Sequence, residues 1–379
     1  MTAARLARTD AATVGPLPEA GAWEDLFARA RAPHPFYAPR VLDAHRAAGL
    51  LPADLRCVTV RRDGRLAALL PFTLRRDVTA LGGRVARPWL SPFVTATAPL
   101  VAGDDPALLN AHFDALAEGL EAASGGRGWR WPLLPTQEGA APGLLAALRA
   151  RGWALGAVAA FERPVLDRRA DHDAFLAGHP HRGRLKDLRR RARRLGEAGA
   201  LEHVAATGGP ALAALVEAFL VLEQAGWKGA AGTAMACRPE TAALARALFG
   251  DAPGPVGARA DALTLDGRPI AVSLALVAGG TATLLKTAYD EALRAHAPGL
   301  LLEAEIVRAC HADAFADRLD AATLAGSALE SLYRERTPVA ELIALPPGAG
   351  RTVSLERRLR LARFEGEARA AARRALRRR

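Results

Sequence analysis

The sequence predicts an α/β protein in which two halves of the chain repeat one order of strands and helices. Each half contains an Asp-Gly turn between two apolar, β-prone runs, at residues 57–74 and at residues 261–277. Such a turn between apolar runs is a strong signal for a β-hairpin. Strands and helices alternate after both hairpins, which is typical of layered α/β folds. We therefore expect two mixed, twisted sheets, each flanked by helices.

The elements expected after the two hairpins correspond one by one. In the first half they are a strand, a helix, a strand, a helix and a strand, at residues 95–101, 106–123, 129–134, 143–151 and 154–161. In the second half the same order is expected at residues 281–288, 299–310, 317–322, 327–336 and 339–345. Between the halves we expect a short helix and a basic helix within residues 171–200, and an amphipathic helix at 210–224. We place two domains at residues 1–165 and 166–350, followed by a basic tail at 351–379.

The net charge of +11 is concentrated in two segments. Residues 351–379 carry eleven arginines and three glutamates, and residues 182–194 carry eight basic residues and one aspartate. The rest of the chain is slightly acidic, so the high pI does not by itself indicate a nucleic-acid-binding protein. The helix expected at 182–194 has charges around most of its circumference, which favours a solvated helix over a dedicated polyanion site. Weak contact of the basic segments with tRNA or anionic lipid stays open.

The cysteine pattern indicates a reducing compartment. Cys57, Cys237 and Cys310 lie far apart and lack the CxxC spacing of redox and zinc sites. No run of 18 apolar residues is present, and the N-terminus lacks the apolar core of a secretory signal. We expect a cytoplasmic protein with no transmembrane segment and no metal.

Lysine is rare in this chain compared with arginine. The chain has 51 basic residues, of which only Lys186, Lys228 and Lys286 are lysines. Lysine has a compact charged group with a tunable pKa, which arginine lacks. Lys286 lies on a predicted strand shortly before Tyr289 and Asp290. This position points to an enzyme, with Lys286 as a candidate for binding a substrate anion or stabilising an oxyanion.

The segment at residues 281–305 predicts an anion site. It consists of a strand, a polar turn that ends in Pro298-Gly299, and an apolar helix. The first N–H groups of a helix have no partner within the helix, and the helix dipole is positive at that end. We therefore expect the start of this helix to face a phosphate or another anion.

Four segments carry a resemblance to a known family. They are the basic helix HRGRLKDLRRRARRLGEAG, the GWKG segment with Gly232-Thr233, the LKTAYDE segment leading to PGLL, and the SALESLY segment that ends at Tyr333. The second half of the chain resembles the GNAT acyltransferase fold. The whole chain resembles the double-domain, Fem-like branch that includes CelD-type acetyltransferase-like proteins. The resemblance covers residues 171–345, and over residues 50–165 it concerns element order alone.

The resemblance implies acyl transfer from acyl-CoA, with acetyl-CoA as the simplest co-substrate, to an amine or hydroxyl. In this family a splayed strand, here residues 281–288, pairs with the pantetheine arm and lends an N–H to the oxyanion. The implied catalytic residues are Lys286, Tyr289, Asp290 and Tyr333. The implied donor-binding residues are Arg294, Pro298, Gly299, Leu300 and Leu301. The implied acceptor-binding residues are Trp227, Lys228 and Asp320, and the acceptor is a small molecule, a saccharide or a cell-envelope precursor.

Each assignment has a structural alternative. Lys286 could form an ion pair with Asp290 or Glu291, and Tyr333 could make a structural hydrogen bond. Trp227 could cover the core while Lys228 extends to solvent. In the catalytic interpretation, the hydroxyl of Tyr333 protonates the departing thiolate.

One departure from the family pattern leaves the donor open. The family loop reads Q/R-x-x-G-x-G/A, and here Ala297 stands at the middle glycine and Pro298 follows it. An alanine side chain and a residue without an N–H weaken a pyrophosphate cradle. Fem-like relatives use aminoacyl-tRNA as the donor, so transfer of an aminoacyl group from charged tRNA is the alternative enzyme activity. A non-catalytic polyanion-binding protein on the same fold is the other alternative.

Overall fold

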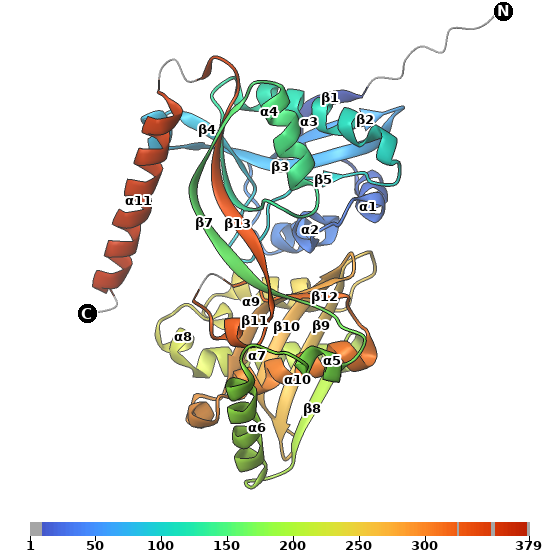
Figure 1. Cartoon of the computed structure of the whole chain (residues 1–379), viewed down its shortest axis with the longest axis vertical. Helices are drawn as coiled ribbons and strands as arrows, with labels where there is room; N and C mark the ends of the chain where they lie inside the picture. The colour runs from blue at the N-terminus through green and yellow to red at the C-terminus, as the bar shows by residue number, and fades with distance from the viewer. Residues whose placement is uncertain (1–9, 324–325, 350–352, 377–379) are drawn as a thin grey trace, which may run out of the picture. The chain divides into compact units, whose positions relative to one another are not determined.

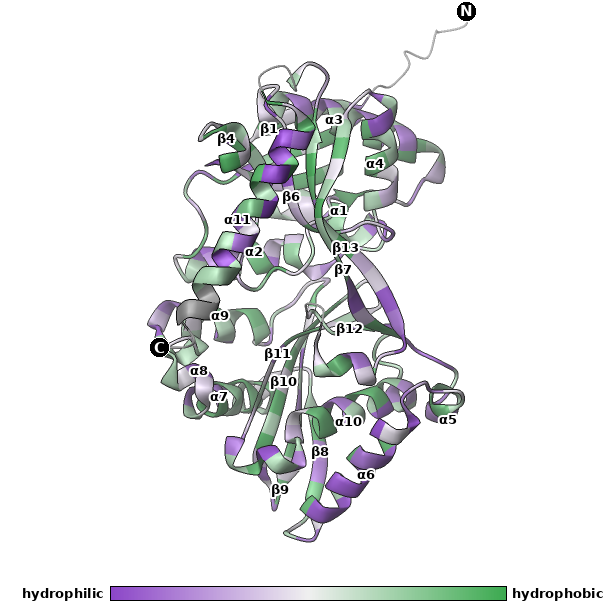
Figure 2. Ribbon diagram, turned by 60° about the vertical axis from the view of Figure 1, so that its left-hand side comes forward, coloured by the Kyte–Doolittle hydropathy of each residue, from purple (hydrophilic) through white to green (hydrophobic). Residues whose placement is uncertain are grey.

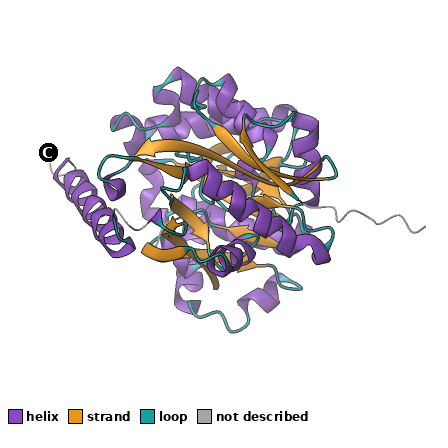
Figure 3. Cartoon of the chain, turned by 90° about the horizontal axis from the view of Figure 1, so that it is seen from above, coloured by secondary structure: helices purple, strands orange, loops and turns teal. Residues whose placement is uncertain are grey.

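The computed structural model describes residues 10–323, 326–349 and 353–376, which fold into two compact units (Figure 1). Unit 1 comprises residues 1–39, 52–161 and 338–379, and unit 2 comprises residues 40–51 and 162–337. Helices flank the strands, as Figure 3 shows. The predicted α/β class with mixed sheets is confirmed.

The sheet of unit 1 has the order β1-β2-β3-β4-β6-β13. Its strands are β1 (Ala11–Gly15), β2 (Arg56–Arg62), β3 (Arg65–Arg76), β4 (Arg84–Pro88), β6 (Trp129–Pro135) and β13 (Glu335–Leu345). Neighbours are antiparallel except β4 and β6, which are parallel and pair only at Ala86 and Trp129. A short strand, β5 (Leu100–Val101), pairs with β3.

The helices of unit 1 cover this sheet. They are α1 (Ala20–Arg29), α3 (Leu109–Ser124), α4 (Ala141–Ala150) and α11 (Leu355–Leu376). Helix α3 packs on β1, β2 and β3, and α1 packs on β3. Three fully buried tryptophans, Trp89, Trp129 and Trp131, fill the core of this unit. Helix α11 packs through Leu355, Leu359 and Ala362 against Val158 and Ile343.

The sheet of unit 2 has the order β7-β12-β11-β10-β9-β8. Its strands are the end of β7 (Ala154–Asp167), β8 (Leu201–Ala206), β9 (Gly257–Leu265), β10 (Arg268–Ala278), β11 (Thr281–Tyr289) and β12 (Arg318–Asp320). All neighbours are antiparallel except β11 and β12, which are parallel.

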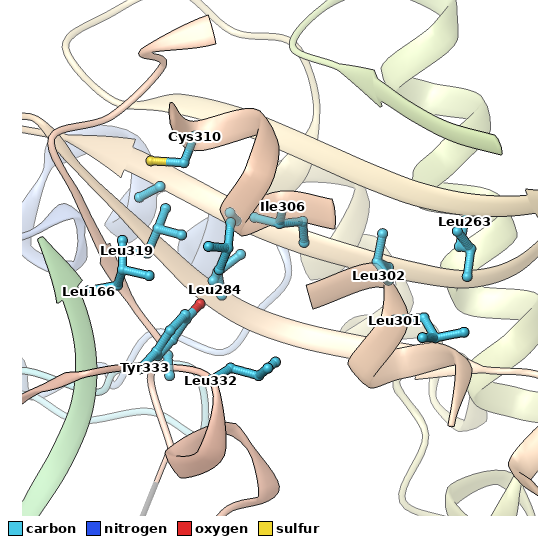
Figure 4. Close-up of a cluster of buried hydrophobic side chains, with 14 of the residues drawn as sticks. Leu166, Leu263, Leu284, Leu301, Leu302, Ile306, Cys310, Leu319, Leu332 and Tyr333 are labelled. Atoms are coloured by element: carbon cyan, nitrogen blue, oxygen red, sulfur yellow. The ribbon is translucent and has the colours of Figure 1, made fainter. Parts of the chain in front are cut away.

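The helices of unit 2 are α2 (Pro39–Ala47), α5 (His172–Leu176), α6 (Arg182–Gly196), α7 (Gly209–Ala225), α8 (Trp227–Ala230), α9 (Pro239–Phe249) and α10 (Pro298–Asp313). Both α7 and α10 pack against β9, β10 and β11. The core around α10 includes Leu263, Leu284, Leu302, Leu319 and Tyr333 (Figure 4). Helix α6 is hydrophilic along most of its length (Figure 2).

The two predicted hairpins are confirmed as β2–β3 and β9–β10. In each turn the Asp and the Gly both have positive φ, 52° and 79° at Asp63-Gly64 and 49° and 75° at Asp266-Gly267. These angles match the type I′ turn, whose twist fits two adjacent antiparallel strands and which favours Asp-Gly.

The repeat in element order is also present. Unit 1 runs β1, α1, β2, β3, β4, α3, β6, and unit 2 runs β8, α7, β9, β10, β11, α10, β12. The strand expected at residues 95–101 is wrong except for Leu100–Val101, because β4 takes the position that corresponds to β11. The charged and proline-flanked sequence RVARP of β4 hid that strand from pattern analysis.

The helix expected at residues 327–336 is wrong as well. Only the 3-10 turn Ala328–Ser331 forms there, and β13 begins at Glu335. Pro338 follows closely, and the residue before a proline is disfavoured in helical conformation. Leu332 and Tyr333 instead turn into the core.

No single helix in the described ranges is long and apolar enough to cross a membrane. Within the same ranges, α7 and the following segment Trp227–Cys237 together have the required length and apolar character, but the chain bends by 59° between them. In the same residues no group of three or more His, Cys, Asp or Glu side chains could hold a metal ion.

Candidate functional site

The site begins with a bulge in β11. Leu274 of β10 pairs with Lys286 and Ala275 pairs with Leu284, so Leu285 is an extra residue without a partner on β10. A bulge bends its strand and redirects the side chains beside it, and bulges are common next to active sites. Lys286 is the residue that follows this bulge.

Strands β11 and β12 separate directly after they meet. Their parallel pairing covers Thr281 to Thr283 of β11 and Arg318 to Asp320 of β12. Beyond Thr283, the edge of β11 that faces β12 has no ladder partner among the described strands. Unpaired backbone groups at a strand edge bind another extended chain readily. This edge can therefore accept an extended ligand.

Helix α10 begins at the open end of this gap. Its N-cap, Ala297, lies in the left-handed region at φ 54° and ψ 54°. The N–H groups of Leu300 and Leu301 both donate to the carbonyl oxygen of Ala297, at 3.0 and 3.1 Å. Since Pro298 has no N–H, Gly299 supplies the remaining N–H of the first turn. The predicted anion site at this helix start is thus smaller than the sequence suggested.

A cavity of about 430 Å³ connects the bulge, the gap and the start of α10. Its lining from β11 includes Lys286 and Tyr289, and its lining from the loop and α10 includes Arg294, Gly299 and Leu300. Residues 321–323 and 328–329 complete the opposite wall. Five residues predicted for the site therefore share one cavity, together with Leu284, Leu285, Thr287, Ala297 and Glu303.

Gly299 is packed closely against side chains of β11. A Cβ atom placed on Gly299 would lie 3.3 Å from Cδ1 of Tyr289 and 3.8 Å from Cγ2 of Thr287. The backbone of α10 thus approaches β11 closely at this point. This close approach to Tyr289 accounts for the glycine by packing, and the contact of Gly299 with a ligand stays a prediction.

Glu303 is the residue that sequence analysis missed. Its side chain lines the cavity although the residue is only 1% exposed, and it accepts a hydrogen bond from the hydroxyl of Tyr333. Burial, aided by the charge of Asp261, raises the pKa of Glu303 to about 7. A carboxyl with such a pKa can take up or release a proton near neutral pH. The signal in the sequence was an acid directly after the apolar run LLL, in the segment LLLEAE.

Tyr333 does not line the cavity. The residue is fully buried among apolar side chains (Figure 4), and burial raises the pKa of its hydroxyl well above the usual value. Its hydroxyl donates to Oε1 of Glu303. Tyr333 can therefore influence the cavity only through Glu303.

Two of the three lysines come together beside the cavity. Nζ of Lys228 donates to Oε1 of Glu223 at 2.8 Å, and Oε2 of the same buried carboxylate accepts from the N–H of Met235. Burial first, and then the nearby charge of Lys228, lowers the pKa of Lys286, while Glu223 opposes the effect. A second carboxylate, that of Glu291, lines the hollow beside Lys228 and accepts a hydrogen bond from the N–H of Trp227.

Other predicted residues lie outside the cavity lining. Asp290 accepts from the N–H of Ala292 and from Arg268, and so holds the turn after β11. Asp320 accepts from the N–H of Ala322 and pairs with Arg163 at 3.3 Å. Pro298 is buried in the first turn of α10, and Leu301 points to the opposite side of that helix, where it lines a different cavity.

Trp227 borders a smaller hollow. It lines this hollow with Lys228 and with Thr287 and Tyr289, two residues that also line the main cavity. The side chain of Trp227 is 59% exposed. It therefore does not cover the core, and its ring is free to contact a ligand.

Comparisons with known proteins agree with this geometry. Residues 182–325 match the family model described as acetyltransferase (GNAT) domain. No curated protein matched the chain. The structure is similar to the C-terminal domain of a lysylphosphatidylglycerol synthetase from Agrobacterium fabrum described as putative, with 14% identity and a TM-score of 0.52, over 87% of this chain and 92% of that chain.

Two further solved structures show the same fold. One is L-PGS from Bacillus licheniformis, with 10% identity and a TM-score of 0.52, over 92% of this chain and 98% of that chain. The other is FemX, with 10% identity and a TM-score of 0.51, over 89% of this chain and 98% of that chain. The likeness extends over both units, so the chain as a whole has the fold of these proteins, and the match to the GNAT model lies within unit 2.

Proposed function

Since residues 182–325 form a domain of the GNAT acetyltransferase superfamily, we propose that unit 2 transfers an acyl group from acyl-CoA to an amine or hydroxyl. The observation that carries the proposal is the cavity in which the diverging edge of β11, the start of α10 and the carboxyl of Glu303 meet. Acyl transfer needs a bound donor, a base and a stabilised oxyanion. These three groups can supply all of them.

The donor would lie along the unpaired edge of β11. Its pantetheine amides would bond to the strand, and its phosphates would face Gly299 at the start of α10 with Arg294 beside them. The fit is partial, because the N–H groups of Leu300 and Leu301 already donate to Ala297. Arg294 is exposed and can bind phosphate as a charge-assisted donor.

The chemistry would centre on Glu303 and Lys286. Glu303 would take the proton from the attacking amine or hydroxyl, because its pKa of about 7 suits a base at neutral pH. Lys286 and an N–H of β11 would stabilise the oxyanion that forms on the acyl carbonyl. The protonated Glu303 would then return the proton to the leaving thiolate. Tyr333 would hold the carboxyl of Glu303 in position.

The acceptor would approach past Trp227 and Lys228. The exposed Trp227 ring suits contact with a saccharide or another ring-shaped molecule, and the two lysines suit an acceptor that carries a carboxylate or phosphate. We propose a small molecule, a saccharide or a cell-envelope precursor as the acceptor. The three cysteines are free thiols, which fits a reducing compartment, and we propose the cytoplasm as the place of the reaction.

The test is calorimetric titration of the full-length chain with CoA and acetyl-CoA. We expect micromolar binding by the wild type and loss of binding in Gly299→Asp, since a carboxylate at the helix start repels the phosphates. Asn110→Asp is the matched control, because Asn110 has the same position in the first turn of α3, the corresponding helix of unit 1. We expect it to bind both ligands like the wild type. No binding by the folded wild type would overturn the proposal.

A second candidate function is transfer from aminoacyl-tRNA. Two observations favour it: the reduced anion site at α10 and the exposed basic residues of α6. Filter binding with charged tRNA separates the two donors. Tight tRNA binding without CoA binding would replace acyl-CoA by aminoacyl-tRNA. Binding of neither would leave the non-catalytic alternative, with anionic lipid instead of tRNA as the polyanion.

A further inference from the structure

Helix α10 separates two cavities of different character. Gly299, Leu300 and Glu303 line the cavity described above, and Leu301, Ala304 and Val307 line a second cavity on the other side of the helix. The second cavity has a volume of about 210 Å³ and lies beneath the basic helix α6. The function proposed above does not use it.

The walls of this second cavity are apolar. They come from α5, α6, β8, β9 and α10, and most of their residues belong to the core cluster or pack against it. Besides the α10 residues, the walls include Phe175, Leu176, Leu185, Leu188, Ala192, Leu201, Leu263 and Leu332. Protein interiors are close-packed, and few voids larger than a water molecule occur in a domain. Apolar cavities of this kind stay dry and bind apolar molecules.

The rim of the cavity carries a single positive charge. Its polar side chains belong to His172, Arg189, Glu305 and Arg308. Glu305 and Arg308 pair with each other at 2.7 Å, and burial lowers the pKa of His172, which favours its neutral form. Arg189 is exposed and forms no ion pair within the described part of the chain. The rim therefore has one uncompensated guanidinium next to an apolar interior.

Arg189 also belongs to a basic stripe along α6. Arg182, Lys186, Arg189 and Arg193 follow each other at steps of four, three and four residues and are all exposed, which places them on one face of the helix. The buried Leu188 and Leu195 occupy another face. The helix is thus amphipathic, with a narrow apolar face, and Arg184, Arg190, Arg191 and Arg194 extend its charge over most of the remaining circumference, as predicted. Arg189 is the member of the stripe that also borders the apolar cavity.

We propose that the cavity beneath α6 binds the hydrocarbon chain of a medium-chain fatty carboxylate, whose carboxylate is held by Arg189. Apolar walls bind the chain by removing it from water. The guanidinium at the rim binds the carboxylate in a charge-assisted pair. A polyanion such as RNA would use the basic stripe but would gain nothing from the apolar cavity, so the fatty carboxylate accounts for both features.

The test is calorimetric titration of the full-length chain with decanoate below its micelle concentration. Decanol, which has the same chain without the charge, is the matched ligand. We expect micromolar binding of decanoate by the wild type and at least tenfold weaker binding by Arg189→Ala. The matched control is Arg193→Ala, which removes an exposed charge from the same stripe but not from the cavity rim. We expect this variant to bind within twofold of the wild type.

The variants Ala192→Phe and Ala304→Leu test whether the apolar cavity beneath α6 binds the hydrocarbon chain. Both side chains line the cavity, and we expect the larger ones to fill it and abolish the binding of decanoate and decanol. Circular dichroism and the melting temperature show whether each variant folds. Arg189→Ala should change decanol binding less than twofold, because the alcohol carries no charge for the guanidinium to hold.

Three outcomes would overturn the proposal. They are no decanoate binding by the wild type, unchanged binding in the folded cavity-filling variants, and equal losses in Arg189→Ala and Arg193→Ala. Equal losses together with binding to anionic phosphatidylglycerol vesicles would assign the stripe to a membrane surface instead. Gly299→Asp should keep decanoate binding, so this test is independent of the acyl-CoA proposal.

Discussion

The two units share an order of elements but differ where their parallel strands diverge. In unit 2, β11 and β12 separate beyond Thr283 and border a cavity of about 430 Å³. In unit 1, β4 and β6 also separate after one pair, but the segment at residues 89–99 fills the space beside them. Thr97 donates from its N–H to the carbonyl of Leu133 at 3.2 Å, and Trp131 donates to the carbonyl of Thr97 at 3.1 Å. One fold thus has an open gap in unit 2 and a packed one in unit 1.

Buried charges differ between the units in the same way. In unit 1, Arg130 pairs with Asp77, Glu341 and Glu365. In unit 2, Glu303 is bonded to Tyr333 and has no cationic partner among the described residues. A paired buried acid stays ionised, whereas an unpaired one has a raised pKa. Unit 2 also has paired buried charges, such as those of Arg259 and Asp261, so the difference is that unit 2 keeps one further buried acid, Glu303, in a state that can exchange a proton near neutral pH.

The largest expected effect concerns this unpaired acid. We expect Glu303→Gln to lower the rate of acyl transfer by roughly 10²–10⁴-fold, the usual contribution of a general base. The wild-type rate should rise with pH and level off above about pH 7, because the base must be deprotonated. Release of the CoA thiol in the presence of a panel of amines measures both.

The control for this variant lies in unit 1. Glu118→Gln removes an exposed carboxylate from α3, the helix that corresponds to α10, and should leave the rate unchanged. Equal rates for Glu303→Gln and the wild type would show that Glu303 is not the general base. They would also contradict the proposed functional difference between the two units.

A smaller effect concerns stability. The raised pKa means that the folded state binds the proton of Glu303 more tightly than the unfolded state, so the contribution of Glu303 to stability is greatest below about pH 4.5. It is lost as the pH rises through about 7, and the total change is roughly 3 kcal/mol. Urea unfolding of the wild type and Glu303→Gln at pH 5 and pH 8 measures it. A stability difference between the two proteins that is independent of pH would contradict the burial of an unpaired acid.

The smallest effect concerns the start of α10. Ala297 has the left-handed conformation that costs an alanine about 1–2 kcal/mol, and glycine relieves this strain but gains entropy in the unfolded chain. We therefore expect Ala297→Gly to stabilise the protein by about 0.5 kcal/mol. Thermal unfolding measures the change, with Ala295→Gly in the preceding 3-10 helix, Glu291–His296, as the control. A clear loss of stability in Ala297→Gly would show that the alanine side chain makes contacts worth more than the strain.

Local patterns were sufficient for much of the fold. The two Asp-Gly turns fixed the hairpins, and apolar periodicity located α7 and α10, because these signals depend on neighbouring residues. The segment at residues 327–336 could not be predicted this way. Its helix-like sequence is overruled by burial of Leu332 and Tyr333, which is a tertiary effect.

The candidate site was partly accessible to the same reasoning. The scarcity of lysine marked Lys286 and Lys228, and the Pro298-Gly299 signal marked the start of α10. The roles of these residues remain predictions. Glu303 was missed because one of several acids in a helix has no distinctive local pattern, and its pKa depends on what surrounds it in the fold.

The sequence by itself determined the α/β class, the repeat, the hairpins and the resemblance to GNAT acyltransferases, because each depends on residues close together in the chain. The tertiary structure alone decided which of the two similar units keeps an open gap. It also decided that Glu303 meets Tyr333 across thirty residues and that α10 borders two cavities. These features depend on packing between distant segments, and the burial and charge that result from packing cannot be derived from local patterns.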